Sequence, residues 1–147
     1  MGSLNVPSGG LTYLDANCVV YHIERIAPYV SLLAPVFQAA ESRAIRLVTS
    51  ELTLLECLVK PVRARDAELE RLFRSVLLDS AELALIAISR AVLESAVRLR
   101  ADQGLKTPDA IHAASALAVG CAAFYTNDSD FRSVAGLRTQ VLRDALD

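Results

Sequence analysis

Short runs of apolar residues alternate along the chain with longer stretches in which apolar residues recur at helical spacing. The short runs predict strands over residues 11–15, 45–49, 84–88 and 122–126, with a last, edge strand over 139–142. The stretches between the first four strands are long enough for the crossover connections that parallel strands need. The pattern therefore predicts an α/β fold with a mainly parallel central sheet flanked by helices on both faces.

The intervening stretches carry start and stop signals that are typical of helices. Asn17 and Ser89 are suited to cap a helix N-terminus, Thr107 precedes a proline at a first helical position, and Gly104 is a typical helix end. The expected helices cover residues 17–27, a segment to about Arg43 that Pro35 starts or kinks, 51–59 with its end at Lys60-Pro61, 64–75, 89–104, and Ala110 to Val119 after the Thr107 cap.

Composition favours one globular domain. The chain has 147 residues, of which 53% are hydrophobic and 22% charged, so it can bury a sizeable core. Residues 1–10 are rich in Gly, Ser and Pro, and we expect a flexible lead-in there before a domain over residues 11–147. No apolar run reaches the length of a membrane span, and no secretory signal is recognisable. The three cysteines fit no zinc motif, so we expect a cytoplasmic protein with reduced thiols and no membrane association.

Four carboxylates occupy corresponding positions in this pattern. Asp15 and Asp128 follow the first and fourth predicted strands, Asp109 lies at a helix start, and Glu56 lies one helical stretch after the second strand. In an open α/β sheet, ligands bind outside the carboxyl ends of the strands. Carboxylates that meet there repel one another unless protons or cations neutralise them, and oxygen ligands suit Mg²⁺ or Mn²⁺. We therefore expect all four acids to be catalytic and metal-binding.

Each acid also has a purely structural interpretation. Asp15 could cap the first helix, unless Asn17 does so, and Asp109 could stabilise its helix through the helix dipole. Glu56 could belong to a capping box, although its helix is expected to begin too early for that. Asp128 could simply hydrogen-bond the backbone of a turn. Residue type alone does not decide between a structural and a functional role for these acids. Their positions relative to the predicted strands favour a functional site.

Neighbouring residues are weaker candidates. Asn17, Thr126 and Asp130 could support the metal-binding acids through hydrogen bonds. His112 lies three residues after Asp109 on the same helix face. It is therefore either a direct metal ligand or a packed, hydrogen-bonded histidine.

Other classes of protein fit the pattern less well. The net charge of −2 excludes a generic polyanion binder, although bound cations would make an acidic cleft tolerate phosphate. A receiver domain needs paired acids after its first strand, and a haloacid-dehalogenase-like phosphatase needs an acid where Asn17 stands. The sequence has no recognisable Gly-rich phosphate loop and no Ser-His-Asp or Cys-His arrangement.

Four segments of the sequence resemble a known family. In order and spacing, the following stretches resemble the signature segments of the PIN domain family, and within it single-domain VapC-type toxins: YLDANCVVYHIE, TSELTLLECLVKP, KTPDAIHAASAL and TNDSDF. The resemblance extends over residues 11–142, and the first and third segments are the most specific. It maps the family's acidic residues onto Asp15, Glu56, Asp109 and Asp128, and none of them is missing.

The resemblance implies a metal-dependent ribonuclease that uses Mg²⁺ or Mn²⁺ to cleave an RNA substrate. It also implies a homodimer, for which the helices of residues 17–43 are our candidates. For the toxin of a type II toxin–antitoxin pair, it implies a small antitoxin protein that blocks the cleft. Two alternatives are a housekeeping PIN ribonuclease without an antitoxin and a non-catalytic PIN-fold module for protein interaction.

Overall fold

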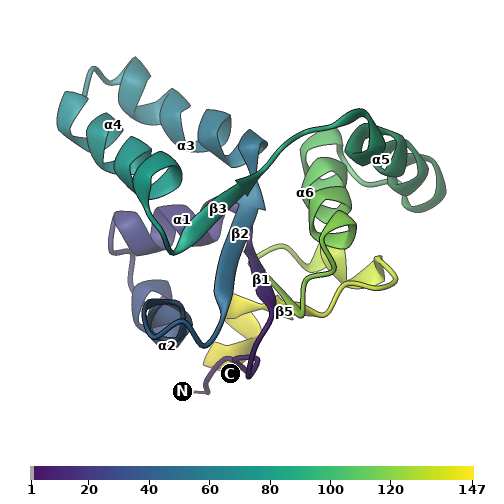
Figure 1. Cartoon of the computed structure of the whole chain (residues 1–147), viewed down its shortest axis with the longest axis horizontal. Helices are drawn as coiled ribbons and strands as arrows, with labels where there is room; N and C mark the ends of the chain where they lie inside the picture. The colour runs from purple at the N-terminus through teal and green to yellow at the C-terminus, as the bar shows by residue number, and fades with distance from the viewer. Residues whose placement is uncertain (1) are drawn as a thin grey trace.

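A parallel sheet of five strands, in the order β3-β2-β1-β4-β5, forms the centre of the molecule. The computed structural model describes residues 2–147, and Figure 1 shows the sheet between two groups of helices. The strands are β1 (Leu11–Leu14), β2 (Arg46–Ser50), β3 (Leu83–Ile86), β4 (Ala123–Thr126) and β5 (Thr139–Val141). The predicted α/β class is confirmed, and every strand pair in this sheet is parallel.

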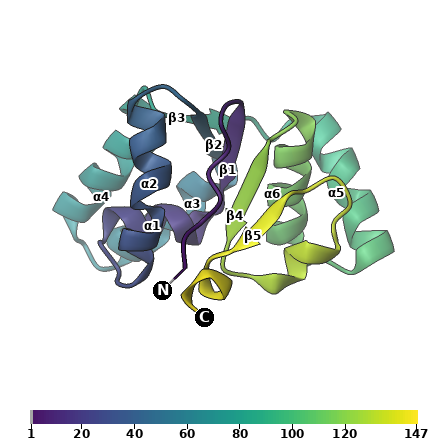
Figure 2. The same ribbon diagram turned by 90° about the horizontal axis from the view of Figure 1, so that it is seen from below.

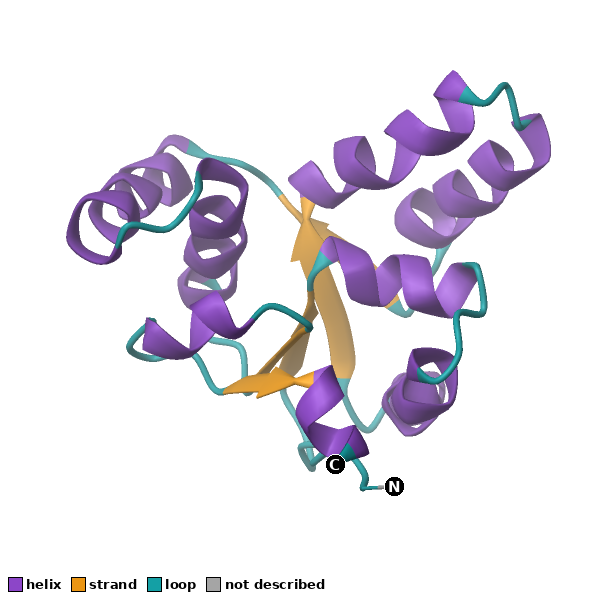
Figure 3. Cartoon of the chain, turned by 180° about the vertical axis from the view of Figure 1, so that it is seen from behind, coloured by secondary structure: helices purple, strands orange, loops and turns teal. Residues whose placement is uncertain are grey.

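Helices cover both faces of the sheet. Figures 2 and 3 show α1 to α4 on one side and α5 and α6 on the other. The α-helices are α1 (Ala16–Ile23), α2 (Tyr29–Glu41), α3 (Glu51–Arg63), α4 (Ala67–Arg74), α5 (Arg90–Gln103) and α6 (Thr107–Ala118), and shorter helical turns cover Ser75–Asp79, Ser129–Ser133 and Leu142–Leu146. Within residues 2–147, no helix is both long enough and apolar enough to cross a membrane.

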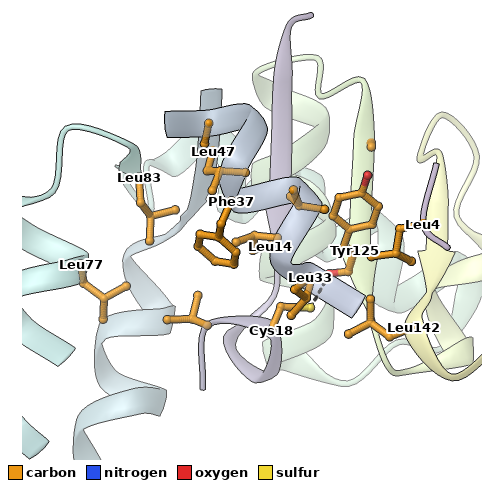
Figure 4. Close-up of a cluster of buried hydrophobic side chains, with 14 of the residues drawn as sticks. Leu4, Leu14, Cys18, Leu33, Phe37, Leu47, Leu77, Leu83, Tyr125 and Leu142 are labelled. Carbon is orange, nitrogen blue, oxygen red and sulfur yellow. Dashed lines mark hydrogen bonds between the residues drawn. The ribbon is translucent and has the colours of Figure 1, made fainter. Parts of the chain in front are cut away.

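Alternate residues of β1 to β4 supply two hydrophobic clusters, one on each face. Leu14 packs on the α1–α4 side with helix residues such as Phe37, as Figure 4 shows. Tyr13 and Phe124 pack on the opposite side against α5 and α6. Because neighbouring residues of a strand point to opposite faces, β1 contributes to both clusters. The carboxyl end of β1 is therefore held by packing from both sides.

The first helix begins one residue earlier than predicted, ends at Ile23 rather than at residue 27, and has a different cap. Asp15 is the N-cap of α1, because its Oδ1 accepts a hydrogen bond from the backbone N–H of Cys18 at 3.1 Å. Asn17 is an exposed residue inside the helix. The prediction that Asn17 caps this helix was wrong, since α1 follows β1 with only the capping residue between them.

The third helix continues past the proline that we expected to end it. Pro61 lies inside α3, which ends at Arg63. Pro61 is buried, and α3 packs against α4. Packing of the proline ring thus compensates for the hydrogen bond that its nitrogen cannot donate. Pro35 also lies inside α2, which begins at Tyr29 rather than at this proline, but unlike Pro61 it is exposed.

Two other helix starts differ from prediction by a few residues. The helix that we expected from residue 64 begins at Ala67, because Asp66 caps it by accepting from the backbone N–H of Leu69 at 3.1 Å. In α6 the capping position belongs to Lys106, which makes no side-chain cap, and Thr107 is the first helical residue. Neither shift moves a candidate site residue to another element.

Residues 2–10 lie against the domain. Leu4 is buried in the α1–α4 cluster. The carbonyl of Asn5 accepts hydrogen bonds from the Tyr125 hydroxyl at 2.8 Å and from the Gln140 side chain at 2.6 Å. The expected flexibility of residues 1–10 concerns motion and stays a prediction, and Met1 lies outside the described residues.

Candidate metal centre

The candidate site lies at the carboxyl ends of β1 and β4, where the direction of the connections reverses. The β1–β2 connection contains α1 and α2 on one face, and the β3–β4 connection contains α5 and α6 on the other (Figure 2). Such a switch point leaves a crevice outside the strand ends. Asp15 follows β1 directly, and Asp128 lies two residues after β4.

Asp109, Asp128 and Asp130 form a group of carboxylates at this edge of the sheet. One oxygen atom from each of the three lies within 4.8 Å of the others. Asp109 lies in the first turn of α6, and Asp128 caps the turn Ser129–Ser133. Asp128 also accepts a hydrogen bond from the backbone N–H of Asp130 at 2.9 Å, so this turn brings the two acids together. The sequence alone had ranked Asp130 below Asp128.

The effect of crowded negative charge is visible at Asp109. Burial raises the pKa of this carboxyl most, and the neighbouring Asp128 raises it further. Asp130 adds to the increase, whereas His112 and Lys106 act in the opposite direction. A carboxylate in such surroundings is stabilised by any proton or cation that reduces the local charge.

Asp15 lies beside this group and is almost fully buried, with 6% of its surface exposed. Burial raises its pKa, and hydrogen bonds from Thr126 and from the backbone of Cys18 lower it. The capping and the site interpretations of Asp15 are compatible, because one carboxylate oxygen caps α1 and the other faces the end of β4. Asp15 is not a member of the close group of three acids.

Thr126, the last residue of β4, connects two of the acids. Its hydroxyl donates to Oδ2 of Asp15 and accepts from the backbone N–H of Asp128 at 3.0 Å. The hydroxyl is fully buried. The hydrogen bonds by which we expected Thr126 to support the acids are therefore present. That they support the binding of a cation stays a prediction.

Glu56 is outside the close group of acids and is hydrogen-bonded to His112. Its Oε1 lies 2.6 Å from Nε2 of His112. It does not form a capping box, because Ser50 caps α3 and Thr53 pairs with the Thr49 hydroxyl at 2.6 Å. The contact between Glu56 and His112 was not foreseen, since the two are 56 residues apart and meet only where α3 packs near α6.

Two further polar residues lie away from the acids. In the part of the chain that the structure describes, Asn17 is exposed and makes no hydrogen bond to a site carboxylate. Glu51, five residues before Glu56 on α3, accepts from the backbone N–H of Ile88 at 3.1 Å. Glu51 therefore holds the segment after β3.

The chain belongs to the PIN domain family, whose model matches residues 12–137. No curated protein matches the chain. Several solved structures have the same fold, and they include chains from toxin–antitoxin complexes.

Three of these structures illustrate the similarity. A chain of the VapBC2 complex from Rickettsia felis, bound to a promoter DNA fragment, is 18% identical, with 88% of this chain and 97% of that chain covered and a TM-score of 0.69. A chain of a toxin–antitoxin complex from Klebsiella pneumoniae is 23% identical, with 86% and 94% covered and a TM-score of 0.61. A chain of VapBC-5 from Mycobacterium tuberculosis is 21% identical, with 91% and 97% covered and a TM-score of 0.55.

The chemistry of the donor atoms fits a hard divalent cation. Among the described residues, the acids of the close group offer only carboxylate oxygens, which suit Mg²⁺ or Mn²⁺. Zn²⁺ prefers nitrogen and sulfur, and both ring nitrogens of His112 are already hydrogen-bonded.

Proposed function

We propose that this protein is a ribonuclease that cleaves RNA phosphodiesters with Mg²⁺ or Mn²⁺. The observation that carries the proposal is the group formed by Asp109, Asp128 and Asp130 at the switch point of a PIN domain. A cluster of three close carboxylates is costly for a protein that uses the fold only for binding. It therefore favours an enzyme over a non-catalytic interaction module.

In this proposal Asp15, Asp109 and Asp128 hold the cation, and Asp130 completes the ligand set. A cation bound there would lower the pKa of a water molecule and neutralise charge on the scissile phosphate. The water oxygen would add to phosphorus, one P–O ester bond would break, and the leaving oxygen would take up a proton. Burial keeps bulk water away from Asp15, which strengthens its electrostatic interactions.

Other side chains would place the RNA and the water. Glu56, at the side of the group, would bind the attacking water or reach the cation through it. Lys106, the capping residue of α6, is close enough to Asp109 to lower its pKa, and it can contact a phosphate. Lys60 is mainly exposed and 3.5 Å from Glu24, and it is a second candidate, together with Arg63 and Arg65.

We further propose that the protein is the toxin of a type II toxin–antitoxin pair and acts in the cytoplasm as a homodimer. The similarity to chains from toxin–antitoxin complexes supports this proposal. Its partner would be a small antitoxin that covers the cleft and places a basic side chain among the acids, where it would pair with them in place of the cation. A housekeeping ribonuclease without an antitoxin is the alternative.

The test is cleavage of labelled RNA by the purified protein with Mg²⁺, with Mn²⁺ and with excess EDTA. We expect cleavage with either cation and none with EDTA. Asp109→Asn and Asp128→Asn should abolish it, whereas Asp79→Asn should not, because Asp79 is an exposed acid beyond α4, away from the site. Undiminished cleavage in EDTA, or by both site variants, would refute the proposal.

A further inference from the structure

His112 links Glu56 to the floor of the site through two short hydrogen bonds. Its Nε2 lies 2.6 Å from Oε1 of Glu56, and its Nδ1 lies 2.6 Å from the Tyr13 hydroxyl. The Tyr13 oxygen in turn accepts from the backbone N–H of Ser50 at 3.1 Å. These contacts join α3, α6, β1 and the end of β2.

The chemistry of these groups decides which atom donates each hydrogen bond. An ionised carboxylate only accepts, so Nε2 of His112 carries a proton and donates it to Glu56. Tyr13 is fully buried, and burial raises the pKa of its phenol, so the hydroxyl keeps its proton. The backbone N–H of Ser50 can only donate to the Tyr13 oxygen, and Nδ1 of an imidazole protonated on Nε2 alone can only accept, so the Tyr13 hydroxyl donates to Nδ1 of His112. A neutral imidazole protonated on Nε2 satisfies all of these groups.

The side chains of Tyr13 and His112 are buried, whereas that of Glu56 is partly exposed. The side chain of His112 is 4% exposed and that of Glu56 is 33% exposed. The ring of Tyr13 stacks on Phe124 with centroids 4.8 Å apart and meets the His112 ring edge to face. A glutamate on a helix surface samples several rotamers, and a charge-assisted hydrogen bond to an immobile ring selects one of them.

We propose that His112 is a positioning residue that fixes the carboxylate of Glu56 against α6, and that it is not a metal ligand. Neither ring nitrogen has a lone pair free for a cation, since one donates to Glu56 and the other accepts from Tyr13. The catalytic consequence of this inference rests on the proposed ribonuclease function. The hydrogen-bond arrangement does not, so the two can be tested separately.

The first test is spectroscopic and uses protein free of metal and RNA. The chain has two histidines, and long-range ¹H–¹⁵N correlation spectra distinguish their tautomers. We expect His112 to be protonated on Nε2, with a slowly exchanging proton that exchanges rapidly in Glu56→Ala. His22, which stacks on Phe37 on the opposite face of the sheet, is the internal control and should not change. Protonation of His112 on Nδ1 alone, or a proton insensitive to Glu56→Ala, would overturn the inference.

The second test is kinetic. His112→Leu removes the donor, whereas His112→Gln keeps an N–H donor that can reach Glu56. We expect Glu56→Ala and His112→Leu each to lower kcat about 10- to 100-fold, as for partners that orient site residues, and the double variant to be no slower than Glu56→Ala. His112→Gln should recover most of the activity.

The kinetic outcomes separate positioning from a merely structural role. If the losses in kcat of the two single variants multiplied in the double variant, His112 would not act through Glu56. The same would follow from a His112→Gln variant as slow as His112→Leu. If His112→Leu fails to fold, the comparison of His112→Gln with Glu56→Ala decides instead. Absence of RNA cleavage by the unmodified protein would count against the proposed function, and the spectra would still decide the hydrogen bonds.

Discussion

Thr126 donates a hydrogen bond to the buried carboxylate of Asp15, a residue 111 positions earlier in the sequence. The two meet because β1 and β4 are neighbours in the sheet. The same hydroxyl accepts from the backbone N–H of Asp128. One small side chain at the end of β4 therefore orients two acids of the candidate centre.

Replacing Thr126 by valine should destabilise the protein by about 1–3 kcal/mol, because a buried acceptor loses its donor. Thr126→Ser keeps the hydroxyl and is the matched control, with only the loss of a methyl group. Urea unfolding in EDTA measures both variants. A valine variant as stable as the unmodified protein would mean that this hydrogen bond has no net effect on stability.

The stability of the metal-free protein should depend on pH through Asp15 and Asp109. Burial raises the pKa of both carboxyls above the ordinary value of 3.8, so the folded protein retains protons that the unfolded chain has released. The contribution of these two groups to stability therefore falls as pH rises from about 4 through their raised pKa values.

Asp109→Asn removes one of these groups and should gain stability relative to the unmodified protein as pH rises through that window. The measurement is the urea midpoint in EDTA at a series of pH values, with Asp79→Asn as the control for a change of net charge. If the difference in urea midpoint between Asp109→Asn and the unmodified protein decreased with rising pH, the effect would have the opposite sign to the one we expect.

Asp15→Asn should remain folded, because asparagine is also a good N-cap.

Added Mg²⁺ or Mn²⁺ should raise the melting temperature, because a ligand that binds only the folded state stabilises it. The shift should be lost in Asp109→Asn and reduced in Asp130→Asn, since both carboxylates belong to the close group. Differential scanning fluorimetry over a titration of each cation measures the effect. A full shift in Asp130→Asn would place this acid outside the ligand set.

The proposed homodimer should use exposed apolar residues of α3. On α3, Leu55 is 62% exposed, Val59 42% and Val62 50%, whereas the large apolar residues of α2 are mostly buried. Residues 17–43 stay a candidate surface, with Ile26 as their exposed large apolar residue. We expect Leu55→Glu to produce a monomer and Ile26→Glu to leave the dimer intact, as measured by light scattering. The reverse result would favour residues 17–43.

Expression of the protein alone should arrest growth, and co-expression of a small cognate protein encoded next to it should restore growth. The physical reason is the acidic cleft, which a basic side chain of the partner can neutralise in place of a cation. Asp109→Asn should be harmless, and a pull-down from the native host should retain the partner. Harmless expression of the unmodified protein with no small partner retained would leave only the housekeeping alternative.

Much of the fold follows from sequence because strand and helix periods are local properties. The positions of Asp15 and Asp128 at strand ends could be predicted in the same way, since a parallel sheet brings its carboxyl ends together. Distances between side chains could not. Asp130 joins the acids through a short helical turn, and the pair Glu56–His112 depends on how two helices pack across the end of β2.

The single-residue error at the first helix has a similar origin. Both Asp15 and Asn17 are favourable caps, and local preference does not distinguish them. The choice is made by β1, which runs directly into α1 and leaves Asp15 in extended conformation at the boundary. The same tight connection buries the carboxylate of Asp15, which we propose as a metal ligand.

The pairing of β1 with β4 also determines when during translation the centre can form. Asp15, Glu56 and Asp109 leave the ribosome first, but Thr126, Asp128 and Asp130 follow only after the connection between β3 and β4 has been made. A nascent chain that ends before β4 lacks the Thr126 hydroxyl that donates to the buried Asp15, and it has only one member of the close acidic group. If the centre cleaves RNA as proposed, the ribosome that makes this protein meets no active nuclease until residue 130 has emerged. By that time α1 to α4 have all emerged. A chain ended at Ala118 should accordingly be inert toward RNA and non-toxic, even though three of the four acids predicted from the sequence are present.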